Sequence, residues 1–144
     1  MSGTLLDPRL EKDTHLLGSL DTTQLLLMRN ALFPWFVLVP ETDEIEFYKL
    51  DPKIQVQLLD QINLLAEFIE SHYPIEKMSI GLIGNMVSQL HVHLVGRNRK
   101  DICWPDVVWG VKEFKPYQPG EVEKTVEKLV QAMRERFRAR PESS

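Results

Sequence analysis

The sequence predicts an α+β fold, and three patterns along the chain support this prediction. Residues 89–95 alternate strictly in side-chain orientation, the two-residue period of a β-strand. Residues 52–73 carry apolar side chains at spacings of three and four, the period of an amphipathic helix, and a second such pattern begins near Pro119. A chain of 144 residues suits one domain, which we place at residues 1–140, with a disordered tail at 141–144.

The first long helix has clear start and stop signals. Asp51 is a good N-cap residue, and Pro52 suits the first helical turn. Pro74 ends the helix, because the residue before a proline avoids helical backbone angles. We expect one side of this helix to be buried, namely Ile54, Leu58, Ile62, Leu65 and Ile69.

The second half of the chain continues with two strands and a final helix. Residues 78–83 have the pattern of a strand, residues 84–88 that of a turn, and residues 89–95 that of the next strand. The final helix would bury Val122, Val126, Leu129, Met133 and Phe137. Its acidic start and basic end match the helix dipole, so the simplest interpretation of its arginines is a solvated face: Glu121 and Glu123 at the start, Arg134, Arg136, Arg138 and Arg140 at the end.

The strand at residues 89–95 reads Gln-Leu-His-Val-His-Leu-Val and contains the candidate functional residues. One face holds Leu90, Val92 and Leu94, and the other holds Gln89, His91, His93 and Val95. An imidazole can act near neutral pH as a nucleophile, a proton carrier or a metal ligand. From the residues alone, the pair could therefore be inert, bind a metal or act in catalysis.

A zinc site would need at least a third protein ligand. The only cysteine is Cys103, and the two other histidines, His15 and His72, show no ligand spacing to the pair. We therefore expect neither a metal nor another cofactor.

Composition excludes several other functions. A net charge of −4 argues against a nucleic-acid-binding surface, although residues 97–100 form a basic cluster after the histidine strand. This cluster, which starts with Arg97, is either a solvated turn or a means of attracting a small phosphorylated ligand. A single cysteine suits a reducing compartment, residues 1–13 do not resemble a signal peptide, and no apolar run could span a bilayer. We expect a cytoplasmic protein without membrane contact.

Residues 84–97 resemble the motif of the histidine triad (HIT) superfamily of nucleotide hydrolases and transferases. That motif is His-φ-His-φ-His-φ-φ, where φ is apolar, preceded by Gly-Gln-x-Val-x. Gly84 and Val87 match it, and His91 and His93 fall on its second and third histidines. Residues 26–40 resemble the family's first hairpin, and Trp104-Pro105 resembles a Trp-Pro that follows the triad, so the resemblance covers about residues 24–110.

Four residues depart from the family's pattern. Gln89 stands in place of the first triad histidine, as in a bacterial subgroup whose motif begins with Gln. Asn85 replaces a phosphate-contacting Gln, and Met86 replaces a Ser or Thr. Trp35 stands where many members have a further histidine. These departures concern the reaction and its substrate rather than the fold.

The resemblance implies an antiparallel sheet of about five strands, with the long helix packed on it and a C-terminal helix. It also implies a nucleotide hydrolase or transferase in which His91 attacks the α-phosphorus and forms a covalent nucleotidyl-histidine. The backbone carbonyl of Gln89 would orient His91, and His93 would bind phosphate oxygens. A nucleotide-binding module with little turnover is the alternative.

Further residues would complete such a site. By resemblance, Asn30 would contact the ribose of a small-molecule nucleotide and Asn85 a phosphate, while Arg97 is a phosphate-binding candidate because it lies in the basic cluster. Members of the family are typically homodimers, and the residues that we expect at the partner's site are Trp104, Pro105 and Trp109.

Overall fold

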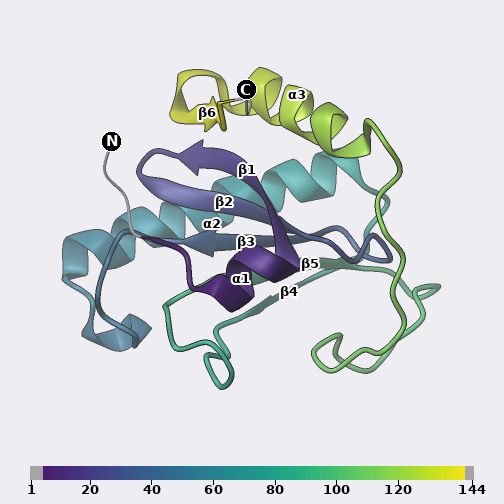
Figure 1. The fold of residues 1–144 in the computed structure, drawn as a ribbon, viewed down its shortest axis with the longest axis horizontal. Helices are drawn as coiled ribbons and strands as arrows, with labels where there is room; N and C mark the ends of the chain where they lie inside the picture. Colours follow the sequence, from purple (N-terminus) through teal and green to yellow (C-terminus); the bar gives the residue numbers. More distant parts are fainter. Residues whose placement is uncertain (1–4, 142–144) are drawn as a thin grey trace.

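Six antiparallel strands form one sheet in the computed structural model, which describes residues 5–141 (Figure 1). The strands are β1 (Thr14–Leu20), β2 (Thr23–Met28), β3 (Trp35–Val39), β4 (Lys77–Gly81), β5 (Val92–Arg97) and β6 (Phe137–Ala139). Their order across the sheet is β4-β5-β3-β2-β1-β6. The α+β fold is therefore confirmed, with six strands where about five were expected. Of the predicted disordered tail, residues 142–144 lie outside the described residues.

Helices cover both faces of this sheet. The α-helices are α1 (Pro8–Asp13), α2 (Pro52–His72) and α3 (Glu121–Met133), and short 3-10 turns occur at Phe47–Lys49 and Arg134–Arg136. Apolar side chains of α2 and α3 enter one core, and Leu10 of α1 enters a second core on the opposite face. In Figure 1, α2 accordingly crosses behind the sheet and α1 lies in front of it.

The long helix α2 begins and ends where its sequence predicts. The Asp51 carboxylate accepts a hydrogen bond of 2.9 Å from the backbone N–H of Lys53, and Pro52 occupies the first turn. Tyr73 adopts extended backbone angles before Pro74 and ends the helix. The predicted apolar stripe is the buried side of α2, with Leu58, Ile62, Leu65 and Ile69 buried and Ile54 partly buried.

The C-terminal segment differs from its prediction. The final helix ends at Met133, because Arg134 takes a φ of 51°, and residues 137–139 pair with β1 as strand β6. Phe137 is still buried, but on a strand. Arg136 is not a solvated helix residue either, since its guanidinium lies 2.8 Å from Asp21 and 2.9 Å from Asp60. Pairing with the edge of β1 satisfies backbone groups that a longer helix would leave exposed there.

The histidine strand also differs in one respect. The alternation is correct, since Leu90, Val92 and Leu94 enter the core beneath α2. Val95 lies on the opposite face, as predicted, and enters the second apolar core there. Strand β5 begins only at Val92, so His91 lies in the segment that leads into it and His93 lies within it.

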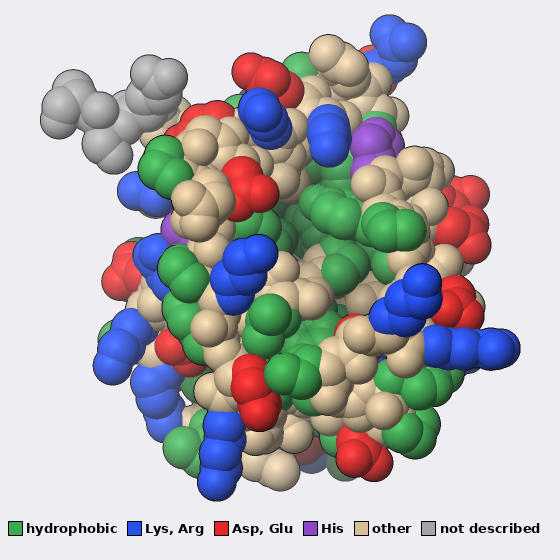
Figure 2. All heavy atoms as spheres, turned by 90° about the vertical axis from the view of Figure 1, so that its right-hand side faces the viewer, with side chains coloured by type: hydrophobic (Ala, Val, Ile, Leu, Met, Phe, Trp, Pro, Cys, Tyr) green, Lys and Arg blue, Asp and Glu red, His purple; other side chains and the backbone are tan. Residues whose placement is uncertain are grey.

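The surface carries charges of both signs. Figure 2 shows apolar side chains gathered in a central recess of one face, with Lys and Arg side chains interspersed among Asp and Glu side chains around it. Within residues 5–141, no helix is long and apolar enough to cross a membrane.

Candidate active site

The backbone of Gln89 fixes the ring of His91. His91 is buried, with 6% of its surface exposed, and its Nδ1 lies 2.7 Å from the Gln89 carbonyl oxygen. A carbonyl oxygen can only accept a hydrogen bond, so Nδ1 of His91 carries the proton. The lone pair of Nε2 is therefore free. The orienting hydrogen bond expected from the sequence is present.

His93 is held in the opposite way, by a side chain of the neighbouring strand. It pairs with Val37 of β3 and with Gly81 of β4. The indole Nε1 of Trp35, on β3, lies 3.0 Å from Nδ1 of His93. An indole N–H can only donate, so Nδ1 of His93 accepts and the neutral ring carries its proton on Nε2. The two histidines thus have opposite tautomers.

Aromatic rings enclose His93 and keep it neutral. Its ring centroid lies 4.9 Å from that of His91, 5.8 Å from that of Trp35 and 5.6 Å from that of Trp109. Burial lowers the pKa of the His93 imidazole to about 4, and the charge of His91 adds to this effect. At pH 7, His93 is therefore an uncharged donor through Nε2–H.

Gly81 provides the space that Trp109 occupies beside His93. A Cβ atom at position 81 would lie 3.1 Å from the indole ring of Trp109, which is closer than ordinary packing allows. The Nε1 atom of Trp109 is buried and has no hydrogen-bond partner among the described residues. Within this chain Trp109 forms part of the wall around His93, and its expected contact with a partner's site stays a prediction.

A cavity of about 360 Å³ opens beside His91. Two segments enclose it, residues 45–48 after β3 and residues 82–91 between β4 and β5. Three of the predicted site residues meet at its wall, namely Asn85, Gln89 and His91. The remaining wall is largely apolar, with Ile45, Phe47, Leu82 and Ile83. Apolar walls with a few convergent polar groups are typical of small-molecule sites.

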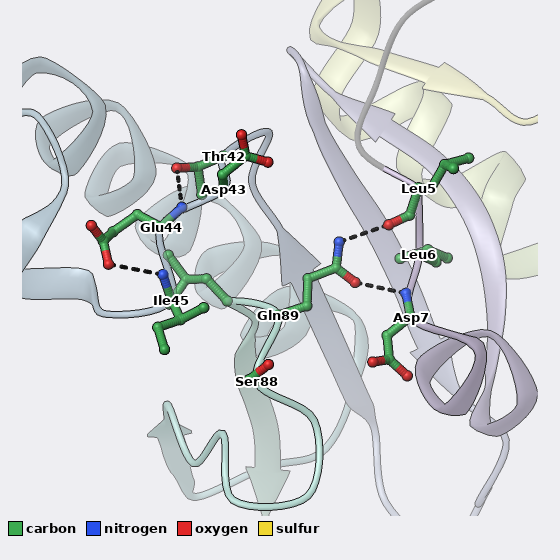
Figure 3. Close-up of a pocket in the computed structure, with 10 residues that line it drawn as sticks. Leu5, Leu6, Asp7, Thr42, Asp43, Glu44, Ile45, Ser88 and Gln89 are labelled. Atoms are coloured by element: carbon green, nitrogen blue, oxygen red, sulfur yellow. Dashed lines mark hydrogen bonds between the residues drawn. The ribbon is translucent and has the colours of Figure 1, made fainter.

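The side chain of Gln89 turns away from His91 toward the N-terminal segment. Its Oε1 accepts a hydrogen bond of 2.7 Å from the backbone N–H of Asp7, and its Nε2 donates one of 2.8 Å to the backbone carbonyl of Leu5 (Figure 3). A second cavity of about 280 Å³ lies here, and Gln89 and Ser88 line both cavities. No pattern along the chain indicated this contact. Asp7 followed by Pro8 is a helix-start signal for α1, but it does not show where that helix lies.

Asn30 does not line the cavity beside His91. Its side chain is buried, and its Nδ2 donates a hydrogen bond of 3.0 Å to the backbone carbonyl of Glu113. Its Oδ1 accepts from the backbone N–H groups of Leu32 and Lys115. The amide therefore ties the β2–β3 turn to the segment before α3, and a ribose contact by Asn30 stays a prediction.

Arg97 is also engaged within the chain. It is 3% exposed, its Nε lies 2.8 Å from a carboxylate oxygen of Asp101, and its Nη2 donates a bond of 2.8 Å to the Asp106 carbonyl. The hydrogen bond with Asp101 raises the pKa of Arg97. Phosphate binding by Arg97 stays a prediction, and the structure shows the guanidinium already paired. Of the same basic cluster, Arg99 pairs with Glu76 on the surface.

Among residues 5–141, the histidine pair has no third metal ligand nearby. Within the part of the chain that the structure describes, no three His, Cys, Asp or Glu side chains are placed to hold a metal ion. The Nδ1 atoms of His91 and His93 are both in hydrogen bonds, so each ring offers only Nε2 to any ligand.

A comparison with protein families identifies the family of this chain. The model of the HIT domain matches residues 9–100, which is more than half of the chain. This chain belongs to the histidine triad (HIT) family. The HIT family is one of nucleotide-binding proteins and hydrolases, and in this HIT protein Gln89 stands at the first triad position. A search of curated proteins gives no match.

Solved structures of histidine triad proteins are similar over nearly the whole chain. One from Sinorhizobium meliloti is 36% identical with a TM-score of 0.85, covering 89% of this chain and 96% of that one. One from Bradyrhizobium japonicum is 32% identical with a TM-score of 0.86, covering 92% and 99%. One from Marinobacter aquaeolei is 34% identical with a TM-score of 0.85, covering 92% and 97%. The predicted fold and family are thus confirmed.

Proposed function

We propose that this HIT protein is a nucleotide hydrolase or transferase that attacks the α-phosphorus of a nucleotide conjugate with His91. The opposite tautomers of the two histidines carry the proposal. His91 presents the free lone pair that a nucleophile needs, and His93 presents an N–H that can bind a phosphate oxygen. The hydrogen bonds that set these tautomers come from a backbone carbonyl and from Trp35, and neither partner depends on a histidine at position 89.

The proposed reaction has two steps. Nε2 of His91 forms a bond to the α-phosphorus, and the bond from phosphorus to the leaving group breaks with its electron pair on the leaving group. The imidazole keeps its proton on Nδ1, hydrogen-bonded to the Gln89 carbonyl, and becomes positively charged. The oxygen of water or of another hydroxyl acceptor then bonds to the phosphorus, the bond from phosphorus to Nε2 breaks with its electron pair on Nε2, and the proton of the attacking oxygen passes to the leaving group or to solvent. His91 returns to its neutral form. Charge that builds up on the phosphoryl oxygens is stabilised by the N–H of His93.

The cavity of about 360 Å³ beside His91 would hold the nucleotide, because it lies at the lower end of the size range of small-molecule sites. Asn85 would bind a phosphate from the rim, and the apolar side chains of Phe47 and Leu82 would contact the base. The arrangement supports a small-molecule substrate and not a nucleic acid. The face of the protein shown in Figure 2 carries charges of both signs, whereas a nucleic-acid-binding face would be mainly basic.

A binding module without turnover is the second candidate, and Gln89 favours it. A glutamine cannot carry a proton near neutral pH, so any proton transfer that depends on the first triad histidine would be lost. Trapping the covalent intermediate separates the two functions. Purified protein is mixed with adenylate conjugates that have amine, phosphate, nucleotide and sugar-phosphate leaving groups, and intact mass is measured after rapid denaturation. A gain of one nucleotidyl group that is absent in His91→Ala supports the enzyme, and binding without adduct or turnover supports the module.

We also propose that the protein is a homodimer joined along β4. This strand lies at one edge of the sheet, and apolar side chains are exposed on it and on the segment that follows, namely Ile80, Leu82, Ile83 and Met86. An exposed apolar edge strand is a template for pairing with another chain. The exposed side chain of Trp104 would then be available to the partner. The expected compartment remains the cytoplasm, which rests on the sequence alone.

A further inference from the structure

We propose that Gln89 is a positioning residue whose side chain fastens residues 5–7 to the histidine segment and so holds the Asp7 carboxylate beside His91. The inference rests on the proposed function, because it assigns Asp7 a role in stabilising the charged form of His91. It gives the residue at the first triad position a task that the histidine of the family motif would not perform.

The contact between Gln89 and the N-terminal segment has the form of a strand pairing. The side-chain amide accepts from the N–H of Asp7 and donates to the C=O of Leu5, two main-chain groups that a neighbouring strand would otherwise pair. Figure 3 shows both bonds on the same side of the amide. The side chain of Leu5 is 87% exposed, so its burial contributes little to holding this segment. The two hydrogen bonds are therefore the main fastening at residue 5.

The chemistry of an amide suits this task better than that of histidine or glutamate. In an amide, oxygen and nitrogen present an acceptor and a donor side by side in one plane, which permits two nearly parallel bonds to main-chain groups. The two nitrogens of an imidazole point in diverging directions and cannot form that pair. A carboxylate has no donor for the Leu5 carbonyl. Of these three residues, only Gln can form both hydrogen bonds at position 89.

The fastened segment carries a negative charge on Asp7. The Asp7 carboxylate accepts a hydrogen bond of 2.9 Å from the backbone N–H of Arg9 and pairs with its guanidinium. These contacts with Arg9 are the main reason why the pKa of the Asp7 carboxyl is below its usual value, and the nearby charge of His91 lowers that pKa further. Asp7 is therefore ionised at pH 7 and interacts favourably with a positively charged His91.

Gln89 contacts both partners of this interaction. Its carbonyl oxygen binds Nδ1 of His91, while its side chain binds the backbone of Asp7. One residue thus sets the tautomer of the nucleophile and places the carboxylate that stabilises its charged form. Because the covalent intermediate carries the positive charge of His91, a carboxylate held in place favours that state without reorganising during the reaction.

Hydrogen exchange tests the fastening without any substrate. The Asp7 amide is followed by NMR in the wild-type protein, in Gln89→Ala and in Gln57→Ala, which makes the same change on the exposed side of α2. We expect the Asp7 amide to exchange at least about tenfold faster in Gln89→Ala, as for the loss of one hydrogen bond of about 1.4 kcal/mol, and to be unchanged in Gln57→Ala. Gln89→Glu is the second variant. Its carboxylate can still accept from the Asp7 N–H but has no donor for the Leu5 carbonyl, so the exchange should be accelerated less than in Gln89→Ala. Unchanged exchange in Gln89→Ala would overturn the proposal.

Single-turnover formation of the His91 adduct tests the role of the charge. Asp7→Asn keeps an oxygen that can cap α1 but removes the carboxylate, and we expect it to form the adduct about three- to fivefold more slowly, as is typical of a partly exposed charge pair. The difference from wild type should shrink at about 1 M salt, where the screening length falls to about 3 Å. A purely structural effect would not respond to salt in this way.

The hydrogen-exchange and adduct-formation experiments test different parts of the proposal. Equal adduct rates for Asp7→Asn and wild type at low salt would overturn the role of Asp7. A wild-type protein that forms no adduct with any conjugate would overturn the proposed function and the role of Asp7 with it, whereas the exchange result would still decide whether Gln89 fastens the segment. Gln89→His adds a direct comparison, because it restores the family's histidine and removes the fastening. We expect it to lower the adduct rate.

Discussion

The indole nitrogen of Trp35 lies 3.0 Å from Nδ1 of His93, and this one contact determines which nitrogen of His93 carries the proton. The two residues are on neighbouring strands, β3 and β5, and both side chains lie on the face opposite α2. Trp35 cannot titrate, so the tautomer that it imposes holds at every pH at which His93 is neutral.

The first prediction concerns this contact. Trp35→Phe keeps an aromatic ring but removes the donor, which leaves a buried acceptor on His93 without its partner. We expect the free energy of unfolding to fall by about 1–3 kcal/mol, and the proton of His93 to divide between its two nitrogens. Urea denaturation and nitrogen NMR of the imidazole measure the two effects. Trp104→Phe, which changes a ring stacked near Arg97, is the control. A single Nε2–H tautomer in Trp35→Phe would contradict the prediction.

The second prediction separates chemistry from binding. His91→Ala should abolish adduct formation and turnover, because the nucleophile is gone, while nucleotide affinity changes by no more than about tenfold, or about 1.4 kcal/mol. Mass spectrometry and calorimetry give the two quantities. His72→Ala removes a histidine at the end of α2 and should leave both unchanged. Turnover in a pure His91→Ala preparation would show that another residue acts as the nucleophile.

The third prediction is a pH dependence of stability. Burial lowers the pKa of His93 to about 4, from about 6.5 in an unfolded chain. Between these values the unfolded chain binds a proton that the folded protein does not, so the contribution is fully present above pH 6.5 and is lost as the pH falls toward 4. The loss amounts to roughly 3 kcal/mol.

The corresponding measurement compares urea denaturation of the wild type and of His93→Gln from pH 7 to pH 4. All other titrating groups are common to both proteins, so the difference between the two curves isolates His93. We expect the wild type to lose more stability than His93→Gln over this range. Parallel curves would mean that His93 titrates alike in the folded and unfolded chain.

The fourth prediction concerns assembly. Ile80 is 47% exposed on β4, and Ile80→Glu should convert a dimer to a monomer, because a charge would be buried where the two edge strands meet. Light scattering after size exclusion gives the mass. Val56→Glu places the same charge on the exposed side of α2 and should leave the mass unchanged. A wild-type protein that is already monomeric at micromolar concentration would refute the assembly.

The fifth prediction is that the purified protein holds no stoichiometric metal. His91 and His93 each have one nitrogen in a hydrogen bond, and a metal would have to displace the attacking lone pair of His91. Elemental analysis after purification without added zinc measures this directly. One zinc per chain that disappears in the double variant His91→Ala, His93→Ala would overturn the role of His91 as the nucleophile.

Local patterns predicted the parts of this protein that local forces determine. Helix α2 begins at its Asp-Pro signal and ends before Pro74, because caps and proline act within a few residues. The bond from His91 to the Gln89 carbonyl was expected from the family resemblance, and its two partners are only two residues apart.

Contacts between distant segments were not predictable from the same patterns. The side chain of Gln89 binds residues more than 80 positions earlier, and β6 pairs with a strand near the start of the chain. Arg97 was predicted to bind phosphate only because it lies in a basic cluster. In the folded chain it pairs with Asp101, four residues later. The β1–β2 hairpin did leave a signal, two apolar runs on either side of Asp21-Thr22, which is typical of a turn between strands.

The two edge strands of the sheet, β4 and β6, differ, and this difference limits how many chains can associate. Strand β6 closes one end with only three residues, of which Arg138 and Ala139 are exposed, and such a short, charged strand is a poor template for further pairing. Strand β4 leaves the other end apolar. A second copy joined at β4 would place a β6 strand at each outer end. Association would then stop at two chains, and the apolar edge would not seed fibres even at high concentration.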